Sequence, residues 1–211
     1  MKHKIRYAWN RYPVFTIVLV ASNIIIYLLC EIFGSTLNTS FMIDAGASFG
    51  PYIFEEHEYF RLFSCMFLHF GSSHLVSNML SLAVMGNELE LSIGHFSFLA
   101  TYLVSGLGAS LISSYAYYTM NDPVVSAGAS GAIMGIAGAL IVYLVANKSR
   151  FDHSRGLRLL IVVVLMLHNG MNSTQIDNYA HMGGLAVGGL IMVILLFFKN
   201  TKKEKKTTYY Y

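Results

Sequence analysis

The chain passes from a polar loop into an apolar helix at Ser126-Ala127-Gly128-Ala129-Ser130-Gly131-Ala132-Ile133-Met134-Gly135. Ser130 lies between glycines at what hydropathy indicates is the mouth of a membrane span. Gly128 and Gly131 let backbone come close to the Ser130 side chain. The first N–H groups of a helix also lack intrahelical partners, so donors are available near this hydroxyl. The stretch predicts either a helix built for close packing or a serine that takes part in chemistry.

Composition places the chain among membrane proteins. Of its 211 residues, 55% are hydrophobic and 12% are charged, against roughly 25% charged in soluble proteins. This indicates an all-α polytopic membrane protein in contact with lipid, and no nucleic-acid partner is expected. Cys30 and Cys65 form no framework or metal-type motif, which is typical of structural thiols and leaves the redox compartment open.

Hydropathy predicts a bundle of six transmembrane helices. The predicted spans are residues 13–33, 74–92, 96–115, 127–146, 158–168 and 179–198. The connection 34–73, between helices 1 and 2, is mixed in polarity and is expected to be an ordered, partly membrane-embedded loop with short amphipathic helices. The predicted organisation is a cytoplasmic N-terminal segment (1–12), a six-span domain (13–198) and a basic, disordered cytoplasmic tail (199–211).

The basic residues predict the orientation. All of the 14 lysines and arginines except Arg61 fall before span one, between spans four and five or at the first residue of span five, or after span six. The positive-inside rule therefore predicts that both termini are cytoplasmic and that spans two, four and six run from outside to inside. The short tails and basic ends favour a bacterial cytoplasmic membrane.

Four polar residues are predicted at one depth in the bilayer. His74 and Asn78 lie in the first turns of span two, Ser130 in that of span four and His181 in that of span six. At 1.5 Å per residue, all four lie within about 10 Å of the outer ends of their helices. Because polar groups inside a membrane are costly, their convergence indicates a functional site.

Two glycine stripes suggest how the helices meet. Gly131 and Gly135 form a small-xxx-small stripe on span four, and Gly184 and Gly188 form another on span six. Such stripes allow close backbone approach, which can bring the Ser130 hydroxyl within hydrogen-bond reach of His181.

These residue types suit nucleophilic catalysis. Serine needs an adjacent base, for which a neutral imidazole is suited. His74 and Asn78 share a helix face at i, i+4 and can both donate to a developing oxyanion. Asp177, four residues before His181, is expected at the outer edge of the span, so a dyad is preferred to a triad.

Three motifs follow one another on the second, fourth and sixth spans: His74-x-x-x-Asn78, Gly128-x-Ser130-Gly131 and Ala180-His181-x-x-Gly184-x-x-x-Gly188. With these motifs, the chain resembles the rhomboid intramembrane serine proteases over essentially its whole length. The segment Glu58-Tyr59-Phe60-Arg61, followed by His69, is similar to that family's acidic-aromatic-arginine motif.

The resemblance implies a role for each matching residue. Ser130 would be the nucleophile and His181 the base, with His74, Asn78 and the backbone around Gly128 as the oxyanion hole. Arg61 and Glu58 would brace the loop between the first two spans, and His69 belongs to the same supporting motif. The chain departs from many relatives at Met134, where an aromatic side chain often packs beneath the base. The substrates implied are transmembrane segments of other proteins, with no metal or cofactor.

Two other interpretations remain. One is a catalytically inactive binder or chaperone of membrane helices on the same scaffold, whose expected mark is loss of Ser130 or His181. The other is a metal-dependent enzyme using His69, His74 and His181, although no HExxH motif or carboxylate partner accompanies them.

Overall fold

The protein is mostly helical. The computed structural model describes residues 12–147, 161 and 177–208. The elements that follow the first span are short: α3 (Thr39–Asp44), β1 (Ser48–Phe49), α4 (Gly50–Phe54), α5 (Arg61–Ser64) and η1 (Cys65–Phe67). The remaining elements are α2 (Val14–Phe33), α6 (Gly71–Ile93), α7 (His95–Thr119), β2 (Val125–Ser126), α8 (Ser130–Ala146) and α10 (Asn178–Thr208).

Five of the predicted spans coincide with helices, namely α2, α6, α7, α8 and α10. The predicted span 158–168 lies outside the described residues, so the count of six stays a prediction. Within the described part of the chain, three helical stretches are long and apolar enough to cross a membrane: Val14–Phe33, His95–Thr119 and Asn178–Lys199. The chain is therefore a helical protein with membrane-spanning segments.

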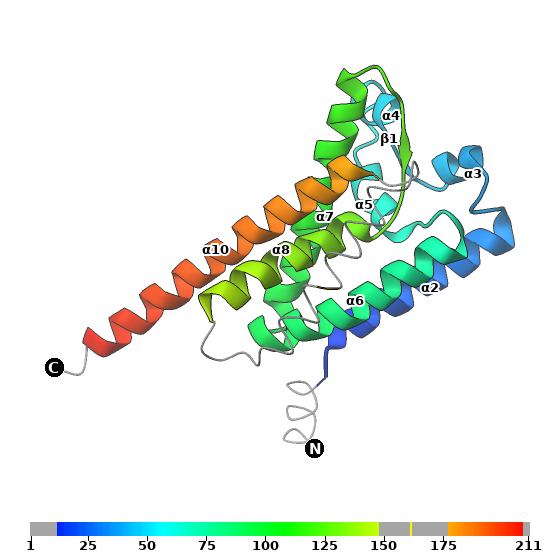
Figure 1. The fold of residues 1–211 in the computed structure, drawn as a ribbon. Helices are drawn as coiled ribbons and strands as arrows, with labels where there is room; N and C mark the ends of the chain where they lie inside the picture. Colours follow the sequence, from blue (N-terminus) through cyan, green and yellow to red (C-terminus); the bar gives the residue numbers. More distant parts are fainter. Residues whose placement is uncertain (1–11, 148–160, 162–176, 209–211) are drawn as a thin grey trace.

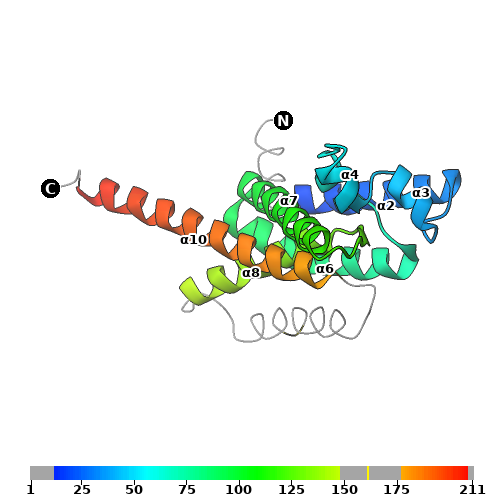
Figure 2. The same ribbon diagram turned by 90° about the horizontal axis from the view of Figure 1, so that it is seen from above.

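The long helices pack in a fixed order. α10 lies along α8 and α7, and α2 lies along α6, as Figure 1 shows. Seen from above, α7 lies between α10 on one side and α4 on the other (Figure 2), and it contacts both. α6 and α7 are joined by Gly94 alone, whose φ of +90° lets the chain reverse there.

The connection between α2 and α6 contains the short helices α3, α4 and α5. Asn38 caps α3 by accepting a hydrogen bond from Phe41 N at 3.1 Å. Strand β1 of this connection pairs antiparallel with β2, with Ser48 opposite Ser126. The described residues are otherwise mostly helical, in agreement with the predicted helical fold, and strand pairs of two residues leave no periodic signal in the sequence. Partial embedding of the connection in the membrane stays a prediction.

A buried carboxylate ties the start of α2 to the α6–α7 turn. Glu90 is fully buried and accepts hydrogen bonds from Thr16 N (2.7 Å), Thr16 Oγ1 (2.7 Å), Phe15 N (2.8 Å) and His95 Nδ1 (2.5 Å). Backbone N–H groups at a helix start lack intrahelical partners, so an anion is stabilised there. Sequence analysis missed this role of Glu90.

The prediction of disorder after residue 198 is wrong for most of that segment. α10 continues through Thr208. Lysine and glutamate dominate residues 202–206, and both are good helix formers, so the apolar helix continues into a polar one.

Candidate active site

All five residues predicted to carry chemistry line one cavity. Its volume is about 980 Å³, and its lining includes Ser130, His181, His74, Asn78 and Gly128. They come from α8, α10, α6 and the loop before α8, so the fold brings together positions far apart in the sequence. The cavity combines polar side chains with apolar walls, as binding sites commonly do.

Ser130 is the first residue of α8, and the loop before it is held by backbone contacts. Gly128 N donates to Cys65 O at 2.9 Å, and Ala129 N donates to His69 Nε2 at 3.4 Å. These bonds tie the serine loop to η1 and to the segment after it. The Ser130 side chain therefore starts from a constrained backbone at a helix N-terminus, where unpaired N–H groups are concentrated.

His74 and Asn78 lie against Gly128. A Cβ at Gly128 would lie 2.8 Å from His74 Cε1 and 3.6 Å from Asn78 Nδ2, and the Gly128 φ is +150°. Only glycine fits this backbone and this contact comfortably. Asn78 is 3% exposed, and its Nδ2 has no hydrogen-bond partner within the described ranges. A buried donor without a partner is costly, and it is what a site prepared for an incoming oxyanion requires.

The glycine stripes of α8 and α10 are in backbone contact. A Cβ at Gly184 would lie 2.0 Å from Gly131 O, and one at Gly188 would lie 1.9 Å from Gly135 O. The close approach expected from the sequence is therefore present. It brings His181, which is 6% exposed, and Ser130 to the same cavity.

The expected hydrogen bond between Ser130 Oγ and the His181 ring is not formed, although both residues belong to the described part of the chain. Catalytic hydrogen bonds are often long in the absence of substrate and shorten only when it binds. Met134, four residues after Ser130, is fully buried in α8.

Asp177 is engaged with three groups other than the His181 ring. Its Oδ1 accepts from Ala180 N at 2.9 Å, and its Oδ2 accepts from Ser126 Oγ at 2.7 Å and also from Ser113 Oγ. It lies directly before α10 and so caps the helix that carries His181. This arrangement differs from that of a triad acid, which would bond the imidazole. Ser113 and Ser126 were missed by sequence analysis.

His69 supports the serine loop. It is 1% exposed, and burial is the main cause that lowers the pKa of its imidazole to about 3, with His74 contributing. It is therefore neutral at physiological pH and can accept the Ala129 N–H bond at Nε2. Its ring also meets that of His74 edge to face, with centroids 5.3 Å apart.

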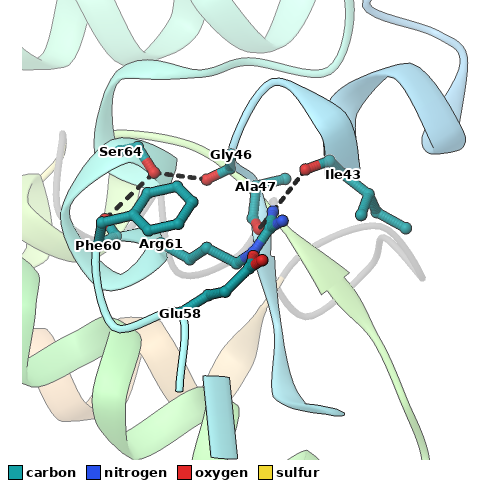
Figure 3. Close-up of polar contacts among 7 residues, drawn as sticks. All are labelled: Ile43, Gly46, Ala47, Glu58, Phe60, Arg61 and Ser64. Atoms are coloured by element: carbon teal, nitrogen blue, oxygen red, sulfur yellow. Dashed lines mark hydrogen bonds and ion pairs between the residues drawn. The ribbon is translucent and has the colours of Figure 1, made fainter. Parts of the chain in front are cut away.

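Arg61 braces the connection between α2 and α6 (Figure 3). Its Nε lies 2.5 Å from Glu58 Oε2, and its guanidinium donates to the carbonyls of Ile43 and Ala47, the latter at 3.1 Å. Arg61 is 5% exposed and does not line the cavity, so its pair with Glu58 is not an ordinary solvated ion pair. The guanidinium thus pairs with Glu58 and also satisfies the carbonyls of buried Ala47 and half-buried Ile43.

The helices that can cross a membrane, together with the polar cavity lined by Ser130 and His181 at the starts of α8 and α10, describe an integral membrane protein. Residues 56–198 match the Rhomboid domain, and the chain belongs to the rhomboid family.

Similar proteins occur in bacteria and plants. The chain is 36% identical over 180 residues to rhomboid protease GluP of Bacillus subtilis, covering 85% of this chain and 34% of the relative. It is 36% identical over 202 residues to rhomboid protease AarA of Providencia stuartii, covering 83% of this chain and 70% of the relative. It is 39% identical over 136 residues to RHOMBOID-like protein 5 of Arabidopsis thaliana, covering 64% of this chain and 43% of the relative. The chain thus spans about a third of the length of GluP and less than half that of the plant relative.

Proposed function

We propose that the protein is an intramembrane serine endopeptidase that cleaves transmembrane segments of other membrane proteins near the outer membrane face. The observation that carries this proposal is the meeting of Ser130 and His181 at one cavity, on helices in backbone contact. The names of GluP and AarA as proteases support it.

The proposed reaction begins with His181 as general base. Its neutral imidazole takes the proton of Ser130 as Oγ attacks the scissile carbonyl. Asn78 Nδ2, His74 and the backbone N–H groups at the start of α8 stabilise the oxyanion. The imidazolium then gives its proton to the leaving amine, and a water molecule hydrolyses the acyl-enzyme with His181 again as base.

The substrate is a membrane helix that can open. A scissile bond must leave helical hydrogen bonding before Ser130 can attack it, so Gly, Pro or polar residues near the bond favour cleavage. Gly128, Gly131 and the small residues around them favour a small side chain before the cut. Residues 13–198 form the proposed catalytic domain. The basic residues support a cytoplasmic side for both termini, and the proposed location is a bacterial cytoplasmic membrane.

The alternative is an inactive binder of membrane helices on the same scaffold. The missing hydrogen bond between Ser130 and His181 is the observation that keeps it open, together with the presence of relatives named only RHOMBOID-like. Both Ser130 and His181 are present in this chain, which favours the enzyme.

The test compares purified wild type with Ser130→Ala and His181→Ala on a model transmembrane substrate in proteoliposomes. The matched control is Ser40→Ala, at an exposed position in α3. Wild type and control should cleave and should react with a fluorophosphonate probe, whereas both site variants should do neither. Cleavage that survives Ser130→Ala contradicts the serine mechanism. Substrate binding by wild type without cleavage or labelling identifies the inactive binder.

A further inference from the structure

We propose that Asp177 is a positioning residue for the reaction, a carboxylate that sets the distance between the segment leading into Ser130 and the segment leading into His181. This inference rests on the proposed function, and it assigns no direct contact between Asp177 and the substrate or the His181 ring.

One side chain joins three separate parts of the fold. Oδ1 accepts from Ala180 N at 2.9 Å in the first turn of α10, and Oδ2 accepts from Ser126 Oγ at 2.7 Å in β2. Oδ2 also accepts from Ser113 Oγ in α7, and Ser113 is 2% exposed. Hydrogen bonds to a carboxylate are stronger than those between neutral groups, so this junction holds α7, β2 and α10 together.

The two residues of the junction lie at equal distances in sequence from the reacting residues. Ser126 precedes Ser130 by four residues, and Asp177 precedes His181 by four residues. The Ser126–Asp177 hydrogen bond therefore joins the two segments of the chain four residues before the proposed nucleophile and four residues before the proposed base. Ser126 is itself fixed, because it pairs with Ser48 across the β1–β2 ladder.

The glycine contacts between α8 and α10 determine how closely the two helices pack. They do not hold the loop before α8, which is positioned by other contacts. Gly128 N is held by Cys65 O and Ala129 N by His69, which restrain that loop from the α6 side. Asp177 restrains it from the α10 side. The loop before Ser130 is thus held by two sets of contacts. The set made by Asp177 is the one that also connects this loop to α10, the helix that carries His181.

The test uses Asp177→Ala, Asp177→Asn, Ser126→Ala and the double variant Ser126→Ala/Asp177→Ala, with Asp44→Asn at an exposed position as control. For each protein, kcat, KM, the rate of fluorophosphonate labelling and the thermal midpoint are measured. We expect Asp177→Ala to lower kcat and labelling between about 10-fold and 10²-fold, the range for displaced catalytic groups, with little change in KM.

Asp177→Asn should recover part of kcat. The asparagine oxygen can cap α10 about as well as the carboxylate, but the NH2 group that then faces Ser113 and Ser126 accepts from neither of them. Ser126→Ala should lower kcat less than Asp177→Ala and should add no further loss in the double variant, since both changes break the same junction. If Asp177→Ala does not fold, the kcat and labelling rates of Asp177→Asn and Ser126→Ala test the proposal instead.

Three results would overturn the proposal. A lower midpoint with unchanged kcat and labelling in Asp177→Ala makes the residue structural only. A loss in Asp177→Asn as large as in His181→Ala, with Ser126→Ala unaffected, makes it a triad acid. Additive losses in the double variant show that no shared junction exists. In each case wild type still cleaves and Ser130→Ala does not, so the proposed function survives; absence of cleavage and labelling in wild type is instead the failure of that function.

Discussion

Gly184 lies directly against the backbone of Gly131, so that a Cβ added at Gly184 would come within 2.0 Å of Gly131 O. The obstacle is a carbonyl of α8 rather than the end of a flexible side chain, so the helices themselves would have to move apart. Gly131 follows Ser130, and Gly184 lies three residues after His181. Of the close backbone contacts between α8 and α10, this one therefore lies nearest in sequence to both Ser130 and His181.

Gly184→Ala should separate α8 from α10 and lower both stability and activity. Overpacking of this kind typically costs about 1–3 kcal/mol, and displacement of Ser130 from His181 should reduce kcat by about 10²-fold. Gly189→Ala is the matched control. Gly189 lies on the same helix as Gly184, but its Cβ would meet Gly138 O of α8 at an ordinary contact distance of 3.7 Å. Thermal midpoints and kcat in detergent check both variants. Equal behaviour of the two would contradict the role of the Gly131–Gly184 contact.

The sequence predicted a close approach of these two helices, but not which glycines meet. A small-xxx-small stripe is a local pattern, so Gly131, Gly135, Gly184 and Gly188 could be read without a structure. The helices were predictable because apolar runs mark them. The basic residues predict the same direction for spans two, four and six, and from this the sequence indicated that their polar residues lie at one depth.

Contacts between side chains that are distant in the sequence could not be predicted in this way. Glu90 meets Thr16 across 74 positions, and Asp177 meets Ser113 across 64. A single serine or glutamate belongs to no periodic pattern from which its hydrogen-bond partner could be predicted. Asp177 had one local signal, since an aspartate directly before an apolar helix is a favoured cap, but nothing local points from it to Ser126.

Glu90→Gln should destabilise the protein without altering its chemistry. The carboxylate accepts from two backbone N–H groups at the start of α2, from Thr16 Oγ1 and from His95. Glutamine keeps the shape but loses the charge and one acceptor, which should cost about 1.5–3 kcal/mol. The free energy of unfolding and the kcat of the folded fraction check this, with exposed Glu56→Gln as control. A loss of kcat at unchanged stability would contradict the assignment.

Gly128→Ala should abolish activity while most of the fold is kept. The new methyl would press on His74 at 2.8 Å from Cε1 and would strain a backbone with φ of +150°. We expect kcat to fall at least about 10²-fold, because His74 and the nearby N–H groups would leave their places.

The control for Gly128→Ala is Gly94→Ala. Gly94 also has a positive φ, +90°, but a Cβ there meets nothing within 4 Å. This variant therefore reports the cost of backbone strain alone, and it should lower the thermal midpoint with little effect on kcat. If both variants lose activity equally, contact with His74 is not the cause.

Asn78→Ala should lower activity without lowering stability, a combination that separates a catalytic donor from a structural one. Asn78 Nδ2 is buried and has no partner among the described residues, so its removal relieves a desolvation cost of about 1–3 kcal/mol. The same group is the proposed oxyanion donor, and loss of one such donor reduces kcat by about 10²–10³-fold. Asn23→Ala in α2 is the control for burial alone. Asn23 is also buried but does not line the cavity; its Nδ2 donates to Leu19 O at 2.8 Å, and its Oδ1 has no partner among the described residues. The control should leave the kcat of the folded fraction unchanged. A lower midpoint in Asn78→Ala with normal kcat would show that Asn78 serves packing, and the oxyanion hole would then need other donors.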